Sequence, residues 1–150
     1  MTLEERLQRL EATRYLLHRY AFAAHHHHDP DGMAACFAED GIWEGEGIGR
    51  HQGRPAIRAF FRELAASMPF VLHYFTNHRI DLAPSGTEAQ GACYSWIPCT
   101  MGGQALWQAS QYTHQYRKVH GQWLFARYSL TLQFITPYDA GWVRERFVPF

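Results

Sequence analysis

Residues 88–135, EAQGACYSWIPCTMGGQALWQASQYTHQYRKVHGQWLFARYSLTLQFI, carry the pattern that decides the fold. Long β-rich runs alternate here with short glycine turns, such as Met101-Gly102-Gly103 and His120-Gly121. Together with one earlier run, the predicted strands span residues 71–82, 88–100, 104–118 and 122–135. Long consecutive strands joined by tight turns predict an antiparallel meander.

The N-terminal part of the chain has helical periodicity instead. Thr2 and Glu5 form a capping-box pattern, and apolar residues then recur at helical spacing until about residue 28. The segment Asp29-Pro30-Asp31-Gly32 interrupts this helix, and a short second helix follows at 33–37, with Gly41 as its left-handed cap. A two-helix hairpin therefore opens the fold.

A third helix is predicted between this hairpin and the meander. A short strand at 41–44 and a glycine-rich stretch at 45–53 precede an amphipathic run at 54–64, which ends near Met68-Pro69. Helices followed by a long antiparallel sheet indicate an α+β fold. Glycines near the turns suit bends that curl such a sheet. We expect a single domain, residues 1–150, built as a cone-shaped α+β barrel.

Composition excludes several classes of protein. The chain has 150 residues, 14 basic and 14 acidic side chains, and 47% hydrophobic residues, which fits an ordinary globular domain and neither nucleic-acid binding nor disorder. Aromatic residues make up 15%, which favours a small-molecule pocket. The three cysteines match no metal or redox motif. Since neither a membrane span nor a secretion signal is present, we expect no membrane association and a cytoplasmic location.

Several motifs resemble one family over almost the whole chain. Residues 37–43 after the helical hairpin, 49–53 before Pro55, and 112–116 leading to Gly121-Gln122-Trp123 are similar to the SnoaL-like branch of the nuclear-transport-factor-like superfamily. Within it, residues 72–80 and 134–137 look most like the group that contains scytalone dehydratase and hexachlorocyclohexane dehydrochlorinase. The resemblance implies cofactor-independent lyase chemistry, with a His–Asp dyad as the base inside the cone.

His73 is the candidate base. It falls at the family's catalytic-histidine position, in the first long strand of the meander. An imidazole titrates near neutral pH, so it can take a proton from carbon and return one to a leaving hydroxyl. The alternative is a core histidine that is bonded to a backbone carbonyl.

The partner of His73 departs from the family pattern. The resemblance places the dyad aspartate near position 26, which is His26 in this chain. Either His26 pairs with His73, or Asp29 supplies the carboxylate, or the dyad is lost. A His–His pair can relay a proton only while one ring stays neutral, so such a site should work poorly in acid.

The run His25-His26-His27-His28 also suggests a metal site. Successive side chains on a helix lie about 100° apart, so only His25 with His28 or Asp29 would share a face. Another ligand would have to come from the sheet. We therefore expect no metal and no cofactor.

The run at 104–118 alternates between two faces. Gln108, Ser110, Tyr112 and His114 share one face, which by resemblance faces the cone; otherwise they are the solvent side of the sheet. These polar groups favour a ligand with oxygens to bond. Three further aromatic residues are expected as pocket liners: Tyr20, Trp43 and Tyr128.

The combined prediction is a dehydratase that acts on a small apolar or aromatic, oxygenated cyclic compound. An isomerase or polyketide cyclase uses the same proton abstraction and is the nearest alternative. A non-catalytic ligand-binding domain or an oxygenase small subunit is another, and a metal-dependent enzyme is the third. Trp96, Trp107 and Trp142 could cover the outer sheet face in a homo-oligomer, a dimer or trimer.

Overall fold

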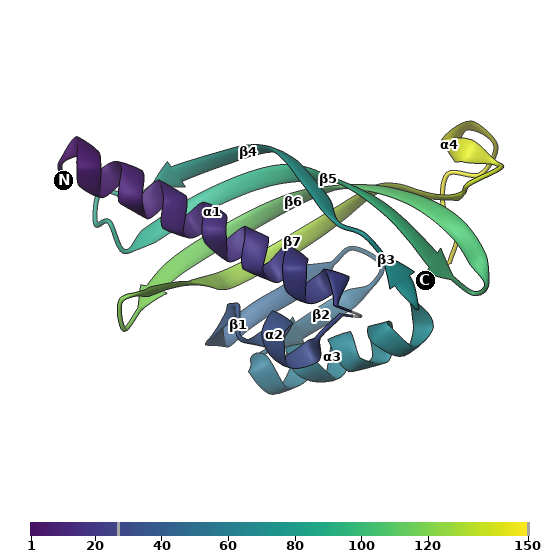
Figure 1. Ribbon diagram of the computed structural model, residues 1–150, viewed down its shortest axis with the longest axis horizontal. Coiled ribbons are helices and arrows are strands. Elements are labelled where there is room, and N and C mark those ends of the chain that lie inside the picture. Colours follow the sequence, from purple (N-terminus) through teal and green to yellow (C-terminus); the bar gives the residue numbers. More distant parts are fainter. Residues whose placement is uncertain (27, 150) are drawn as a thin grey trace.

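The computed structural model describes residues 1–26 and 28–149, and within them a long helix lies across the concave side of a curled sheet (Figure 1). The helices are α1 (Leu3–His25), α2 (Pro30–Ala34), α3 (Arg54–Ser67) and α4 (Gly141–Arg144). The strands are β1 (Phe37–Gly45), β2 (Gly49–Gln52), β3 (Phe70–Val71), β4 (Tyr74–Leu82), β5 (Glu88–Met101), β6 (Gln104–Val119) and β7 (Gln122–Pro137).

The sheet contains the predicted antiparallel meander, and the strands β1, β2 and β3 extend it. Its order is β2-β1-β7-β6-β5-β3, and β4 also pairs with β5. The pairs β4–β5, β5–β6 and β6–β7 are antiparallel, whereas β1 runs parallel to β7, so the sheet is mixed. Register shifts between Ala109 and Ser110, and between Gln115 and Tyr116, interrupt the β6–β7 ladder. Bulges of this kind bend a sheet, and the α+β fold with a curled sheet is confirmed.

The helical hairpin differs from the prediction at its turn. The capping box of Thr2 and Glu5 is present, but α1 ends at His25 rather than near residue 28. Asp29 caps α2 through its side chain, which accepts from the Asp31 amide, and Pro30 occupies the first turn. Because a cap followed by proline starts a helix, α2 begins three residues earlier than expected.

The glycine-rich stretch forms a β-hairpin. The strand predicted at 41–44 extends from Phe37 to Gly45, and β2 returns along it in antiparallel pairing. Gly41 lies within β1, so the expectation that it caps a helix in a left-handed conformation is wrong. A Cβ atom at Gly41 would lie 2.9 Å from the Ala38 oxygen and 3.0 Å from the Phe125 oxygen. Close approach of the backbone at Ala38, within β1, and at Phe125, in β7, is therefore what requires glycine there.

The first predicted strand is broken. Residues 71–82 form two strands, β3 and β4, with Leu72 and His73 between them. Val71 pairs with Cys99 and Tyr74 with Trp96, which places Leu72 opposite Pro98. The Leu72 amide donates to the Pro98 oxygen at 3.1 Å, but proline has no N–H to return the bond. The ladder is interrupted at this point, and His73 lies in the gap rather than in a strand.

The core has two parts, and Leu64 packs against both. The larger one fills the space between α1, α3 and the concave face, around Leu17, Phe37, Phe61 and Phe125. The smaller one lies beyond it, around Met68, Ile97, Leu106 and Ile135. The cysteines, Cys36, Cys93 and Cys99, are free and buried. Among the described residues, no helix is both long and apolar enough to span a membrane.

Candidate active site

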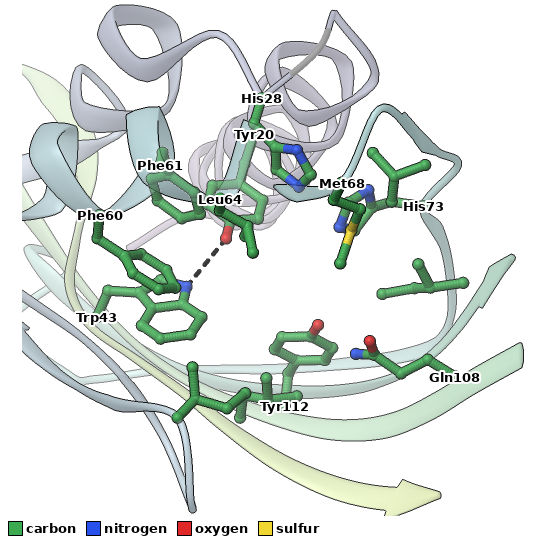
Figure 2. Close-up of a pocket in the computed structure, with 14 residues that line it drawn as sticks. Tyr20, His28, Trp43, Phe60, Phe61, Leu64, Met68, His73, Gln108 and Tyr112 are labelled. Carbon is green, nitrogen blue, oxygen red and sulfur yellow. Dashed lines mark hydrogen bonds between the residues drawn. The ribbon is translucent and has the colours of Figure 1, made fainter. Parts of the chain in front are cut away.

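A cavity lies where the two parts of the core meet, between α1, α3 and the strands β1, β3, β5, β6 and β7 (Figure 2). About 40 Å³ of it is open to the centres of water-sized molecules, which is enough for a few waters. Its apolar walls come from Trp43, Ile48, Phe60, Phe61, Leu64, Met68, Val71, Ile97 and Leu130. Its polar lining comes from Tyr20, His28, His73, Gln108 and Tyr112. Among the described residues, no aspartate, glutamate, lysine or arginine lines it.

The ring of His73 forms part of the cavity wall. Its Nδ1 atom is buried and has no hydrogen-bond partner. Burial and, to a smaller extent, the nearby rings of His28 and His25 together lower the pKa of His73 to about 3. His73 is therefore a neutral imidazole at physiological pH, with a lone pair that can accept a proton.

The structure places a different histidine beside His73 than the sequence predicted. His26 is exposed, and Asp29 is exposed and caps α2, so neither is brought into the cavity. His28 is 2% exposed, and its ring centroid lies 5.9 Å from that of His73 in an edge-on arrangement. The sequence analysis continued the first helix to about residue 28 and expected His26 or Asp29 beside His73. Because α1 ends at His25, the chain turns earlier, and His28 is the residue that lies beside His73. His27 lies outside the described residues.

His25 contacts the main chain of His73 rather than its ring. The His25 Nε2 atom lies 2.6 Å from the His73 amide nitrogen and 3.0 Å from the His73 carbonyl oxygen. The two rings are 5.8 Å apart. The side chain that ends α1 therefore holds the backbone that carries the candidate base.

The predicted polar face of β6 is buried, and two of its residues reach the cavity. Gln108 and Tyr112 line it, and Figure 2 shows the Tyr112 hydroxyl pointing into the open space. Ser110 accepts a hydrogen bond from the Gln108 amide at 3.1 Å and so supports Gln108 from behind. Burial raises the pKa of Tyr112 well above its usual range. Tyr112 therefore remains a neutral hydroxyl donor.

His114 lies on the same face but away from the cavity. Its Nδ1 atom is 3.3 Å from the Tyr116 hydroxyl, and its ring packs 4.7 Å from that of Tyr128. Burial lowers the pKa of His114 to about 3. His114 and Tyr128 are thus packed behind the cavity rather than lining it.

Tyr20 and Trp43 line the cavity, as predicted for pocket residues. The Trp43 indole N–H donates to the Tyr20 hydroxyl at 3.1 Å, and the Tyr20 ring packs 4.5 Å from Tyr128. With one lone pair of its hydroxyl engaged, Tyr20 is a fixed part of the wall. Both residues are almost fully buried.

The sequence analysis missed the face of α3. Phe60, Phe61, Leu64 and Met68 close the cavity on the side opposite β6. Their helical spacing identified an amphipathic helix but not what the apolar side would cover. Among the described residues, no three or more histidine, cysteine, aspartate or glutamate side chains are grouped so that they could hold a metal ion.

Comparison with known proteins is consistent with this architecture. The model of the SnoaL-like domain family matches residues 5–129, and no curated protein matches the chain. A structure from Novosphingobium aromaticivorans, named as a candidate aromatic ring hydroxylase, is 26% identical, with a TM-score of 0.78 and coverage of 91% of this chain and 95% of that one. A candidate scytalone dehydratase from the same organism is 24% identical, with a TM-score of 0.82 and coverage of 91% and 92%. A hexachlorocyclohexane dehydrochlorinase from Novosphingobium barchaimii is 22% identical, with a TM-score of 0.84 and coverage of 99% and 100%.

Proposed function

Because the chain belongs to the SnoaL-like domain family, we propose that it is a cofactor-independent lyase, a dehydratase that acts on a small, uncharged, oxygenated cyclic compound. The observation that carries the proposal is the cavity itself, in which His73 faces Gln108 and Tyr112 across an apolar space (Figure 2). Two of the similar structures carry the names of elimination enzymes, one a candidate dehydratase and the other a dehydrochlorinase.

The lining supports an uncharged substrate. Because no acidic, lysine or arginine side chain lines the described cavity, a carboxylate or phosphate would lose its hydration without gaining an ionic partner. Aromatic and aliphatic walls suit a ring, and the amide of Gln108 with the hydroxyl of Tyr112 suits oxygens on one edge of that ring. The empty cavity is small, so binding requires side chains such as Leu64 and Met68 to move outward.

In the proposed reaction, His73 takes a proton from the carbon next to a carbonyl group. The C–H electron pair moves toward the carbonyl oxygen and gives an enolate. As the C=O bond re-forms, the electron pair of the enolate forms the new carbon–carbon double bond, the C–O bond to a hydroxyl on the adjacent carbon breaks, and the proton on His73 leaves with that hydroxyl as water. Tyr112 donates to the carbonyl oxygen, on which negative charge develops. A base with a pKa of about 3 accepts a proton poorly by itself. The adjacent developing enolate stabilises the imidazolium, so the proton moves only when substrate is bound.

His28 takes the place that the sequence analysis assigned to His26 or Asp29. Its ring lies edge-on to His73 and lines the same cavity. A second neutral imidazole can fix the orientation of His73, but two imidazolium ions would repel each other. We therefore assign His28 an orienting role and leave His26 outside the site.

The experiment is a screen of hydroxylated cyclic ketones and phenols with detection by mass spectrometry. Wild-type protein is expected to convert a member of the panel to a product that has lost one water. His73→Ala should lower kcat by roughly 10²–10⁴-fold, the usual contribution of a general base. His26→Ala, which changes an exposed histidine of the same run, is the matched control and should retain wild-type turnover. A product of unchanged mass with a moved double bond would establish an isomerase instead.

A binding role is the second candidate, favoured by a specific observation. No carboxylate lines the cavity beside His73 in the described part of the chain, and one similar structure is named as a candidate aromatic ring hydroxylase rather than as a lyase. In that case the domain would hold a ligand, or accompany an oxygenase, without turnover of its own. His73→Ala would then change ligand affinity modestly, and no member of the panel would be converted.

A further inference from the structure

We infer that His25 is a positioning residue that replaces a missing strand partner and fixes the main chain of His73. Its catalytic consequence rests on the function proposed above. The structural part of the inference does not depend on that function. His25 itself does not line the cavity, so its action passes through His73.

His73 lies between β3 and β4 at the edge of the described sheet, and its backbone has no sheet partner. In an antiparallel pair, alternate residues direct their N–H and C=O groups toward the neighbouring strand. Leu72 directs its amide toward β5, where it donates to the Pro98 oxygen. The main-chain groups of the next residue, His73, therefore point away from β5. No further strand pairs on that side in the described sheet.

The His25 side chain occupies that side. One imidazole nitrogen, Nε2, is within hydrogen-bond distance of both main-chain groups of His73, at 2.6 Å from the nitrogen and 3.0 Å from the oxygen. The tautomer with a lone pair on Nε2 accepts from the amide, and the tautomer with a proton on Nε2 donates to the carbonyl. Either tautomer supplies one of the bonds that an adjacent strand would make.

This contact links the end of α1 to the candidate base. α1 is anchored in the main core by Leu16, Leu17 and Tyr20, so its last residue has a fixed position. A partly buried backbone without a hydrogen-bond partner would shift to find one. The ring of His73 would then leave its place beside His28. Fixed geometry at a reacting group matters because small displacements reduce rates steeply.

The test compares two variants of His25 with one control. His25→Gln keeps both a donor and an acceptor near the position of Nε2, whereas His25→Phe keeps a flat ring without either. His26→Phe is the control, since it places the same ring on the exposed neighbour. The readout is hydrogen exchange of the His73 amide, measured by NMR on the folded protein.

We expect the His73 amide to exchange at least about 10-fold faster in His25→Phe than in wild type, because exchange reports the loss of its hydrogen bond. His25→Gln should restore protection to within about 3-fold of wild type, and His26→Phe should leave it unchanged. Amides in the centre of β6 should not change in any variant, which separates this local effect from general loosening. Equal protection of the His73 amide in His25→Phe and wild type would overturn the inference.

Turnover provides a second readout once a substrate is identified. His25→Phe should lower kcat by about 10-fold or more with a smaller effect on KM, as expected for misplacement of a reacting group. His25→Gln should recover most of kcat. If no substrate is turned over, the proposed function fails while the exchange result still decides the role of His25. If turnover is found and His25→Phe leaves kcat unchanged, the positioning role is wrong.

Discussion

At the scale of single residues, exposed and buried histidines of the described structure differ in how they respond to pH. His18 and His26 are exposed, whereas burial lowers the pKa of His73 and of His114 to about 3. Burial also lowers the pKa of His51 and of His78. The buried rings are neutral in the native protein and must be protonated when it unfolds in acid.

Stability should therefore fall in acid. Between a pH of about 6.5, where an unfolded histidine titrates, and a pH of about 3, the unfolded state binds more protons than the native state. Each such histidine lowers the free energy of unfolding by up to about 1.4 kcal/mol for each pH unit below 6.5. Urea unfolding at a series of pH values measures this slope. His114→Gln should reduce the slope of the free energy of unfolding against pH, whereas His26→Gln should leave the slope unchanged. A free energy of unfolding that does not change between pH 6.5 and pH 4.5 would contradict the prediction.

The polar wall of the cavity provides a second prediction at this scale. Tyr112→Phe removes the hydroxyl that faces the substrate and should lower kcat/KM by roughly 10-fold, the cost of one hydrogen bond to a group that gains charge. Tyr116→Phe is the matched control, because Tyr116 lies on the same face of β6 but does not line the cavity. Steady-state kinetics on an identified substrate measure both. Equal losses in the two variants would remove Tyr112 from the site.

At the scale of elements, much of the fold was predictable and the details of the site were not. The strands β5, β6 and β7 follow from residue type and turn spacing, and the helices α1 and α3 from periodicity, whereas α4 was not predicted and α2 was predicted three residues too late. The break between β3 and β4 depends on Pro98, which lies opposite Leu72 in space but far from it in the sequence. The end of α1 depends on how Asp29 and Pro30 start α2. Sequence therefore singled out His73, Gln108 and Tyr112, which line the cavity, but not His28, which lies beside His73.

The contact of β1 with β7 is testable through Gly41. Gly41→Ala should destabilise the protein by about 1–3 kcal/mol, because the new methyl group would meet backbone oxygens at 2.9 and 3.0 Å that cannot move freely. Glu39→Ala, an exposed change in the same strand, should stay within about 0.5 kcal/mol of wild type. Chemical denaturation measures both free energies. A neutral Gly41→Ala would mean that β1 can move away from β7.

At the scale of the whole molecule, the outer face of the sheet carries an aromatic patch made of Trp96, Trp107, Phe134 and Trp142. Trp96 packs 5.0 Å from Trp107, and Phe134 stacks 5.0 Å from Trp142. Trp96 is 36% exposed and Trp142 54% exposed. Exposed apolar patches on soluble proteins commonly mark contact surfaces.

We predict that the protein is a dimer or trimer held together through this patch. Trp96→Glu should shift the sedimentation coefficient toward that of the monomer, because a buried carboxylate without a partner opposes association. Phe22→Glu, a change of an exposed aromatic residue on α1, is the control and should leave the assembly intact. A wild-type protein that sediments as a monomer at all concentrations would contradict this prediction.

The central claim is that His73 is the base of a catalytic cavity. The measurement that tests it most directly is the ratio of kcat between His73→Ala and His26→Ala on the first substrate that the wild-type protein dehydrates. The account predicts that His73→Ala is slower by at least about 10²-fold, with both variants folded as judged by near-ultraviolet circular dichroism. Turnover in His73→Ala equal to that in His26→Ala would contradict the account and leave the cavity as a binding site only.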